Sequence, residues 1–269
     1  MGLRCHKKSY LRLTMDICTR IKADDLRKFL STKVIDSKYL ENYRVNNVYP
    51  ALKEFVIGDG ETLDGETLQQ EVFPTSKYHY DVFISHSHND LELITKFAAY
   101  LEKQCGLSVF LDSYVWKSAD GLLRRLDDKY CKDKDGKHYI YKRRNYSTSH
   151  VHAMLSMAIM EMIDKTHCSI FVESENSLKL HNLKPTTKAM TLSPWIYEEI
   201  CMMKYIRPKH QITDTIQKSF SLNEELQIAH SVDVSKLFPI TLFQLKDLDK
   251  SRSKWLEALY KAFFATELL

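Results

Sequence analysis

The sequence predicts an α/β fold, in which helices cover both faces of an open, parallel sheet. Three short apolar runs have the composition of buried strands, and each ends in polar residues. A helical pattern lies between the first two runs, and another precedes the third. This alternation is typical of parallel sheets. The three runs are Tyr80–His86, Leu107–Asp112 and Ser169–Val172.

The first run is the best-defined strand. Val82–Ile84 is continuously apolar, and the polar stretch after it leads into a helix whose apolar residues recur at helical spacing from Leu91 to Leu101. Ligands of open α/β sheets bind beyond the carboxyl ends of the strands. Ser85 and His86 are therefore candidate binding residues.

Later elements complete the predicted domain. Ser147 or Ser149 is expected to cap a helix, Lys236–Leu242 is a final strand, and Ser253–Phe264 is a closing amphipathic helix.

Residues 1–76 are predicted to form a mostly helical N-terminal extension, and residues 77–269 the main domain. Apolar residues between Leu11 and Leu30 recur at roughly helical intervals, and Gly58–Gly60 is a strong breaker. The sequence assigns this extension no function.

A polar insertion at about residues 127–149 interrupts the main domain. Tyr139, Tyr141 and Tyr146 surround the basic run Lys142–Arg144. A hairpin with a solvated face is the favoured interpretation, and the alternative is a patch that helps to hold a dinucleotide.

Composition excludes several classes of partner. The 269 residues include 39 Lys and Arg against 35 Asp and Glu, so charge gives no general argument for nucleic-acid binding. The six cysteines show no regular spacing, and no apolar run approaches the length of about 18 residues that suggests a membrane span. We expect reduced thiols, a cytoplasmic location and no membrane partner.

Ser193–Ile200 predicts a well-capped helix with Pro194 at its first position. Trp195 and Glu199 are four residues apart, so one helix face can present an aromatic ring and a carboxylate to the same cleft. In most proteins a pair of this kind has a structural role: the Trp packs against neighbouring residues, and the Glu is stabilised by the dipole at the helix N-terminus. A catalytic role is the less frequent one.

The motifs together resemble TIR (Toll/interleukin-1 receptor) domains, in particular the NAD-cleaving, bacterial-type branch. Tyr80–Ser87 is similar to the family's first strand, and Gly106–Asp112 fits the pattern Gly-x-x-Val-Phe-x-Asp of its second. Ser193–Ile200 is similar to the signature Ser-x-Trp-x-x-x-Glu of TIR domains that cleave NAD. The resemblance covers about residues 78–265 in element order. It implies a flavodoxin-like sheet of strand order 2-1-3-4-5 and a loop at Ser113–Gly121 after the second strand.

The resemblance implies an NAD+ glycohydrolase or ADP-ribosyl cyclase that releases nicotinamide, with Glu199 as the catalytic carboxylate. NAD+ is then the substrate, and no metal or other cofactor is needed, because a carboxylate can stabilise the oxocarbenium-like state as nicotinamide leaves. Relatives of this kind act in immune or antiphage defence, self-associate through TIR–TIR contacts and can signal to an effector through a nucleotide product. The implied substrate-binding residues are Ser85, His86, Asp112, Trp116 and Trp195.

Two alternatives remain open. A non-enzymatic scaffold would act through TIR–TIR association, although such adaptors often lack the residue equivalent to Glu199. A flavodoxin-like regulator would cluster Asp residues at the first strand's end, where only Asp90 and Asp112 are candidates. The chain also departs from many NAD-cleaving relatives, because Ser87 and His88 stand where those carry a basic residue.

Overall fold

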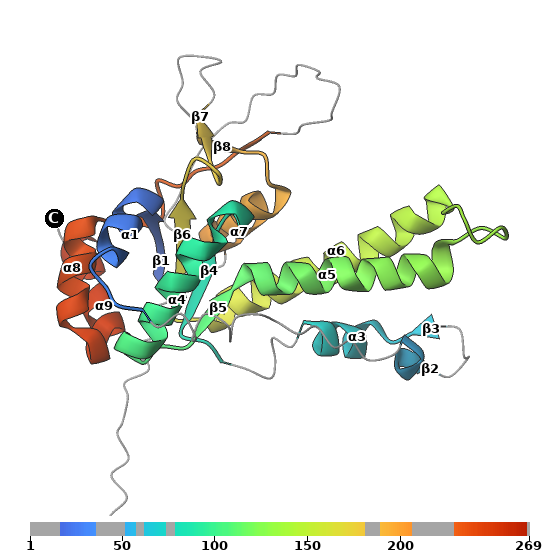
Figure 1. Cartoon of the computed structure of the whole chain (residues 1–269), viewed down its shortest axis with the longest axis horizontal. Coiled ribbons are helices and arrows are strands. Elements are labelled where there is room, and N and C mark those ends of the chain that lie inside the picture. Colours follow the sequence, from blue (N-terminus) through green and yellow to red (C-terminus); the bar gives the residue numbers. More distant parts are fainter. Residues whose placement is uncertain are drawn as a thin grey trace, which may run out of the picture.

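The computed structural model describes residues 17–35, 52–57, 62–73, 79–180, 189–205 and 229–267. At its centre is a five-stranded sheet of order β10-β1-β6-β4-β5, in which every pair is parallel (Figure 1). The predicted α/β fold with a parallel sheet is therefore confirmed. The strands are β1 (Ile17–Lys22), β4 (Val82–Ser85), β5 (Val109–Leu111), β6 (Cys168–Glu173) and β10 (Phe238–Ile240).

Helices cover both faces of this sheet, as predicted. Successive side chains of β4 point to opposite faces, so Val82 and Ile84 join one apolar cluster and Phe83 joins the other. The first cluster contains residues of α1 (Ala23–Leu30), α4 (Leu91–Cys105), α8 (Leu242–Lys250) and α9 (Trp255–Glu267). The second contains residues of α3 (Gly65–Val72), α5 (Asp112–Leu126), α6 (Tyr141–Lys165) and α7 (Pro194–Tyr205).

The prediction that everything before residue 77 is a helical extension is wrong for β1. This strand lies inside the sheet and pairs with β6 on one side and β10 on the other. Ile17 and Ile21 are buried and four residues apart, and that spacing fits one face of a helix as well as alternate positions of a strand. The buried Thr19 between them, 0 % exposed, satisfies only the strand pattern.

The strand order along the chain consequently differs from the flavodoxin-like order. β4 lies between β5 and β6, as the 2-1-3 part of that order requires. The next position is occupied by β1, the first strand of the chain, rather than by a strand that follows β6.

The region after β5 is a long helical hairpin of α5 and α6, which projects from the sheet (Figure 1). The expected loop at Ser113–Gly121 is wrong, because α5 begins at Asp112. Ala119, Leu122 and Leu126 are buried at helical spacing. This apolar face is what makes the segment helical.

Helix α6 begins at Tyr141, before either of the predicted serine caps. Ser149 donates its hydroxyl to the carbonyl oxygen of Asn145 at 2.8 Å, and Ser147 donates to Asp127 at 2.6 Å. Both serines therefore lie within the helix. Their hydroxyls donate to a carbonyl oxygen and to a carboxylate, instead of accepting from the N–H groups at the helix start as a cap would. Within the insertion, Lys132 and Tyr139 form a single antiparallel bridge. The hairpin expected for the basic run is wrong, because Lys142–Arg144 and Tyr146 lie in the first turns of α6.

Shorter elements lie around this core. The helical turns are η1 (Leu52–Phe55), η2 (His88–Asp90), η3 (Asp127–Cys131) and η4 (Arg252–Lys254). Two small antiparallel sheets are formed by β2 (Val56–Ile57) with β3 (Thr62–Leu63), and by β7 (Lys179–Leu180), β8 (Ala189–Thr191) and β9 (His230–Ser231). Among the described helices, none combines the length and apolar character that crossing a membrane requires.

The segment after α1 is tied to the opposite end of the chain through Asp249 of α8. Lys33 contacts this carboxylate at 2.5 Å, and the Tyr100 hydroxyl of α4 donates to it at 2.7 Å. Burial alone would raise the pKa of Asp249, but the hydrogen bonds from Lys33 and Tyr100 outweigh burial and hold that pKa below its usual range.

We predict that Asp249→Asn lowers the free energy of unfolding by about 1–2 kcal/mol at pH 7. Since the pKa of Asp249 is lower in the folded chain, its contribution is complete above the unfolded pKa of about 3.9 and is lost as the pH falls toward the folded value. Urea unfolding at pH 7, 5 and 3.5 measures the free energy of unfolding of both proteins. The difference between wild type and Asp249→Asn should be the same at pH 7 and 5 and smaller at pH 3.5.

Asp247→Asn is the matched control, because Asp247 pairs with exposed Lys250 on the same helix. Its effect should stay within about 0.5 kcal/mol. Equal effects of the two variants would contradict the role given to Asp249.

Candidate active site

The candidate site lies at the carboxyl ends of the central strands. β4 and β6 are parallel neighbours, with Ser85 in register with Phe171. Their ends therefore point the same way, and the polar residues after each strand meet at one edge of the sheet. This is the adjacency that the sequence predicts for the first and third strands of the main domain.

Ser85 and Glu199 are in direct contact at this edge. The Ser85 hydroxyl donates a hydrogen bond to Oε2 of Glu199 at 2.5 Å, although 114 positions separate the two residues. Both side chains are 0 % exposed. A sequence-predicted binding residue and the sequence-predicted catalytic residue thus form one buried pair.

The start of α7 fixes where Glu199 lies. Ser193 caps the helix as predicted, because its hydroxyl accepts a hydrogen bond from the backbone N–H of Ile196 at 3.2 Å. Ile196 and Ile200 are buried in the second apolar cluster. Glu199 lies between them in sequence and is also buried, so packing of α7 brings its carboxylate to the end of β4.

Trp195 is half-buried and packs on α6. Its ring meets the ring of His152 edge to face, with centroids 4.9 Å apart and planes at 79°. This contact ties α7 to the helical hairpin. That Trp195 and Glu199 present their side chains to the same bound ligand stays a prediction.

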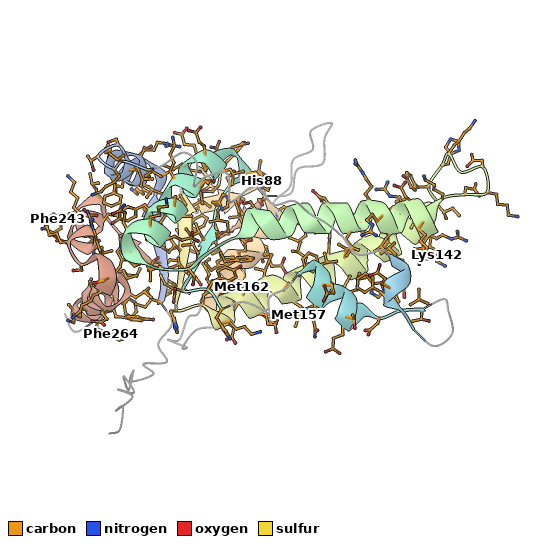
Figure 2. The ribbon with its side chains drawn as sticks, turned by 60° about the horizontal axis from the view of Figure 1, so that its bottom comes forward. His88, Lys142, Met157, Met162, Phe243 and Phe264 are labelled. Carbon is orange, nitrogen blue, oxygen red and sulfur yellow. The ribbon has the colours of Figure 1, made fainter. Side chains whose placement is uncertain are left out.

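His86 is buried at the same edge, with 4 % of its surface exposed. Its Nδ1 lies 3.4 Å from the carbonyl oxygen of Ile84, and the tautomer of the ring decides whether that nitrogen donates. His88, by contrast, is exposed at the start of η2 (Figure 2). The two histidines therefore differ in their access to solvent.

Asp90 is a site residue whose contacts the sequence analysis missed. It is buried, and its carboxylate accepts hydrogen bonds from Ser174 at 2.5 Å and from Asn176 at 3.0 Å. Arg27 of α1 lies 3.5 Å from it. The carboxylate thus links α1 to the loop after β6. The only available signal was an acidic residue close to a strand's carboxyl end, since its partners are distant in sequence.

Asp112 and Trp116 belong to the first turns of α5, directly after β5. Their backbones therefore start from the same edge of the sheet as Ser85. Their side chains lie outside the described part of the structure, so the substrate-binding roles predicted for them stay predictions.

A separate cavity of about 1150 Å³ lies between α3 and the helical hairpin. None of the residues predicted for NAD+ cleavage lines it, whereas Lys142, Arg143 and Tyr146 of the basic, aromatic run do. This cavity and the edge of the sheet are therefore different places. In the described ranges, no group of three or more His, Cys, Asp or Glu side chains is arranged to hold a metal ion.

Comparison of the chain with protein-family models, curated proteins and solved structures gave no match.

We predict that Ser85 and Glu199 are energetically coupled. Ser85→Ala removes a donor from a buried carboxylate and should lower the free energy of unfolding by about 1–3 kcal/mol. In a double-mutant cycle with Glu199→Gln, the two effects should differ from additivity by at least about 0.5 kcal/mol. Chemical denaturation of the four proteins gives this coupling energy.

Ser87→Ala serves as the control, because Ser87 is half-buried and its side chain makes no cap hydrogen bond to η2. It should change stability by less than about 0.5 kcal/mol. Additive effects of Ser85→Ala and Glu199→Gln would show that the pair is not formed in solution.

Proposed function

We propose that this chain cleaves NAD+ at the bond between nicotinamide and ribose, with Glu199 as the catalytic carboxylate. The observation that carries the proposal is the hydrogen bond from Ser85 to Glu199 at the carboxyl edge of the parallel sheet. Ligands of open α/β sheets bind at this edge. The two residues were selected from separate motifs, and their contact is what a shared site requires.

The chemistry suits a carboxylate held by a hydroxyl. When the C1′–N bond breaks, its electron pair goes to the nicotinamide nitrogen, which leaves as a neutral ring, and positive charge develops on the ribose. Glu199 would stabilise that charge, and Ser85 would fix the carboxylate in one orientation. Water then attacks C1′ and loses a proton in the hydrolase, whereas a nitrogen of the adenine attacks in the cyclase.

The burial of Glu199 sets a condition on this activity. Because its side chain is 0 % exposed, NAD+ reaches the carboxylate only after a local rearrangement that opens the edge of the sheet. We therefore propose that basal turnover is low and rises when the chain self-associates, as the TIR resemblance implies. A conformational step of this kind often limits the rate of an enzyme.

The test is nicotinamide release from NAD+ by the purified protein at increasing concentration, with products separated by chromatography. Wild type should release nicotinamide, and Glu199→Gln should be slower by at least about 100-fold. ADP-ribose as the second product identifies a hydrolase, and a cyclic product identifies a cyclase.

Glu198→Gln is the matched control. Glu198 precedes Glu199 on the same helix, is half-buried and points about 100° away around the helix axis. It should keep activity within a few-fold of wild type. Equal losses in both variants would count against Glu199 as the reacting group.

The alternative is a non-enzymatic scaffold that acts through association between copies of the chain. The complete burial of Glu199 favours it, because a buried carboxylate with a hydrogen-bond donor can serve structure alone. Absence of nicotinamide release even from concentrated, associated protein would support the scaffold and contradict the enzyme.

A further inference from the structure

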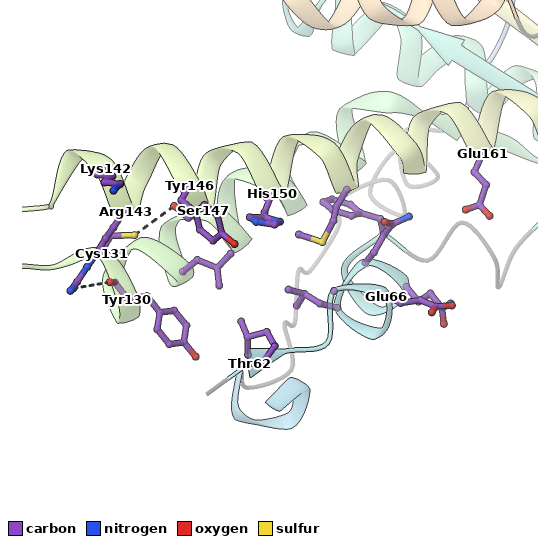
Figure 3. Close-up of a pocket in the computed structure, with 18 residues that line it drawn as sticks. Thr62, Glu66, Tyr130, Cys131, Lys142, Arg143, Tyr146, Ser147, His150 and Glu161 are labelled. Atoms are coloured by element: carbon purple, nitrogen blue, oxygen red, sulfur yellow. Dashed lines mark hydrogen bonds between the residues drawn. The ribbon is translucent and has the colours of Figure 1, made fainter. Parts of the chain in front are cut away.

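The cavity between α3 and the helical hairpin has the composition of a ligand site. Its volume of about 1150 Å³ is slightly above the range of roughly 300–1,000 Å³ typical of small-molecule pockets. One wall comes from α3 and the end of β3, and the other from α5, η3 and α6 (Figure 3).

Apolar side chains also line the cavity. Leu68 and Phe73 line it from α3 and the residue after it, and Met154 lines it from α6. Leu68 and Phe73 are almost fully buried, so this part of the wall is held in place by packing.

One end of the cavity is basic and aromatic. Lys142, Tyr146 and His150 follow one another at intervals of four residues, so they share one face of α6. The rings of Tyr146 and His150 are in contact, with centroids 4.5 Å apart. Tyr146 is nevertheless 70 % exposed, and an exposed aromatic cluster beside a cavity commonly marks a binding surface.

Arg143 of α6 contacts η3 within the same wall at this end. Its guanidinium donates a hydrogen bond to the carbonyl oxygen of Tyr130 in η3 at 3.4 Å, and Figure 3 shows the two residues facing each other. Tyr130 also lines the cavity. Arg143 and Tyr130 therefore bring a cation and a third aromatic ring to the same end.

The charges around the cavity are unevenly paired. Among the described residues, neither Lys142 nor Arg143 forms an ion pair, whereas their neighbour Arg144 contacts Asp127 at 2.9 Å. Of the acidic lining residues, Glu161 forms an ion pair with Lys165 at 3.1 Å, and Glu66 accepts a hydrogen bond from the neutral amide of Gln70. The unpaired charge at the aromatic end is thus positive.

We propose that this cavity binds a nucleotide, with its phosphates held by Lys142 and Arg143 and its base stacked against Tyr146. Arg and Lys form strong, charge-assisted hydrogen bonds with phosphate, and bases stack on aromatic side chains whatever their sequence. The apolar side chains that line the cavity receive the remaining face of the base.

This site is distinct from the edge of the sheet that carries Glu199. His150 lines the cavity, whereas His152, two residues later and about 200° around α6, contacts Trp195. Lys142 lies at the end of the hairpin far from the sheet (Figure 2). The proposal therefore does not depend on NAD+ cleavage, and the two can fail separately.

Isothermal titration calorimetry with ADP tests the proposal, with adenosine and inorganic phosphate as partial ligands. ADP should bind with a Kd below about 1 mM, and both partial ligands should bind at least about tenfold more weakly. Two variants test the roles of the charged and aromatic side chains. The double variant Lys142→Ala with Arg143→Ala should weaken ADP binding by at least about tenfold. Tyr146→Ala should weaken the binding of ADP and of adenosine by similar factors. All three substituted side chains are exposed, so these variants are expected to fold.

Lys134→Ala with Lys137→Ala is the matched control. Both lysines are exposed in the connection between η3 and α6 and do not line the cavity, and replacing them removes the same two positive charges. This variant should bind ADP as wild type does, and so should Glu199→Gln. No ADP binding, an equal loss in both lysine-containing double variants, or loss in Glu199→Gln alone would each overturn the proposal. Binding of a single-stranded oligonucleotide without ADP binding would overturn it in favour of a nucleic-acid surface.

Discussion

The pairing of β1 with two neighbours is the interaction on which the rest of the sheet depends. β10 pairs with β1 and β1 pairs with β6, so the C-terminal strand joins the sheet through the N-terminal strand. The buried side chains of Ile17, Thr19 and Ile21 fit β1 into this position. Segments from both ends of the chain therefore belong to one cooperative unit.

This arrangement also determines what gathers at the carboxyl edge of the sheet. Because α1 follows β1 directly, Arg27 comes within 3.5 Å of Asp90, and Arg20 of β1 pairs with Glu173 of β6 at 2.8 Å. The Ser85–Glu199 pair lies at the end of β4, the strand on the other side of β6. An N-terminal segment to which the sequence assigns no function thus supplies charged residues next to the candidate site.

Local patterns in the sequence were enough to predict β4, β5, β6, α4 and the capped start of α7, because each is specified by continuous apolar runs, helical periodicity or a cap. The position of β1 was not predictable in this way, since Ile17 and Ile21 fit both periodicities. Glu199 could be selected from its motif, but its contact with Ser85 and the partners of Asp90 depend on tertiary packing, which no local pattern encodes. The cavity beside α3 likewise requires segments that are distant in sequence to pack together.

Backbone hydrogen exchange of β1 is the most direct test of this account. An N–H bonded within the middle of a sheet exchanges only when the sheet opens, so the amides of Thr19–Ile21 should be as protected as those of β6. Protection of both strands should also fall together in a variant that destabilises the sheet. Rapid exchange of Thr19–Ile21 while β6 stays protected would contradict the account, because β1 would then lie outside the cooperative sheet.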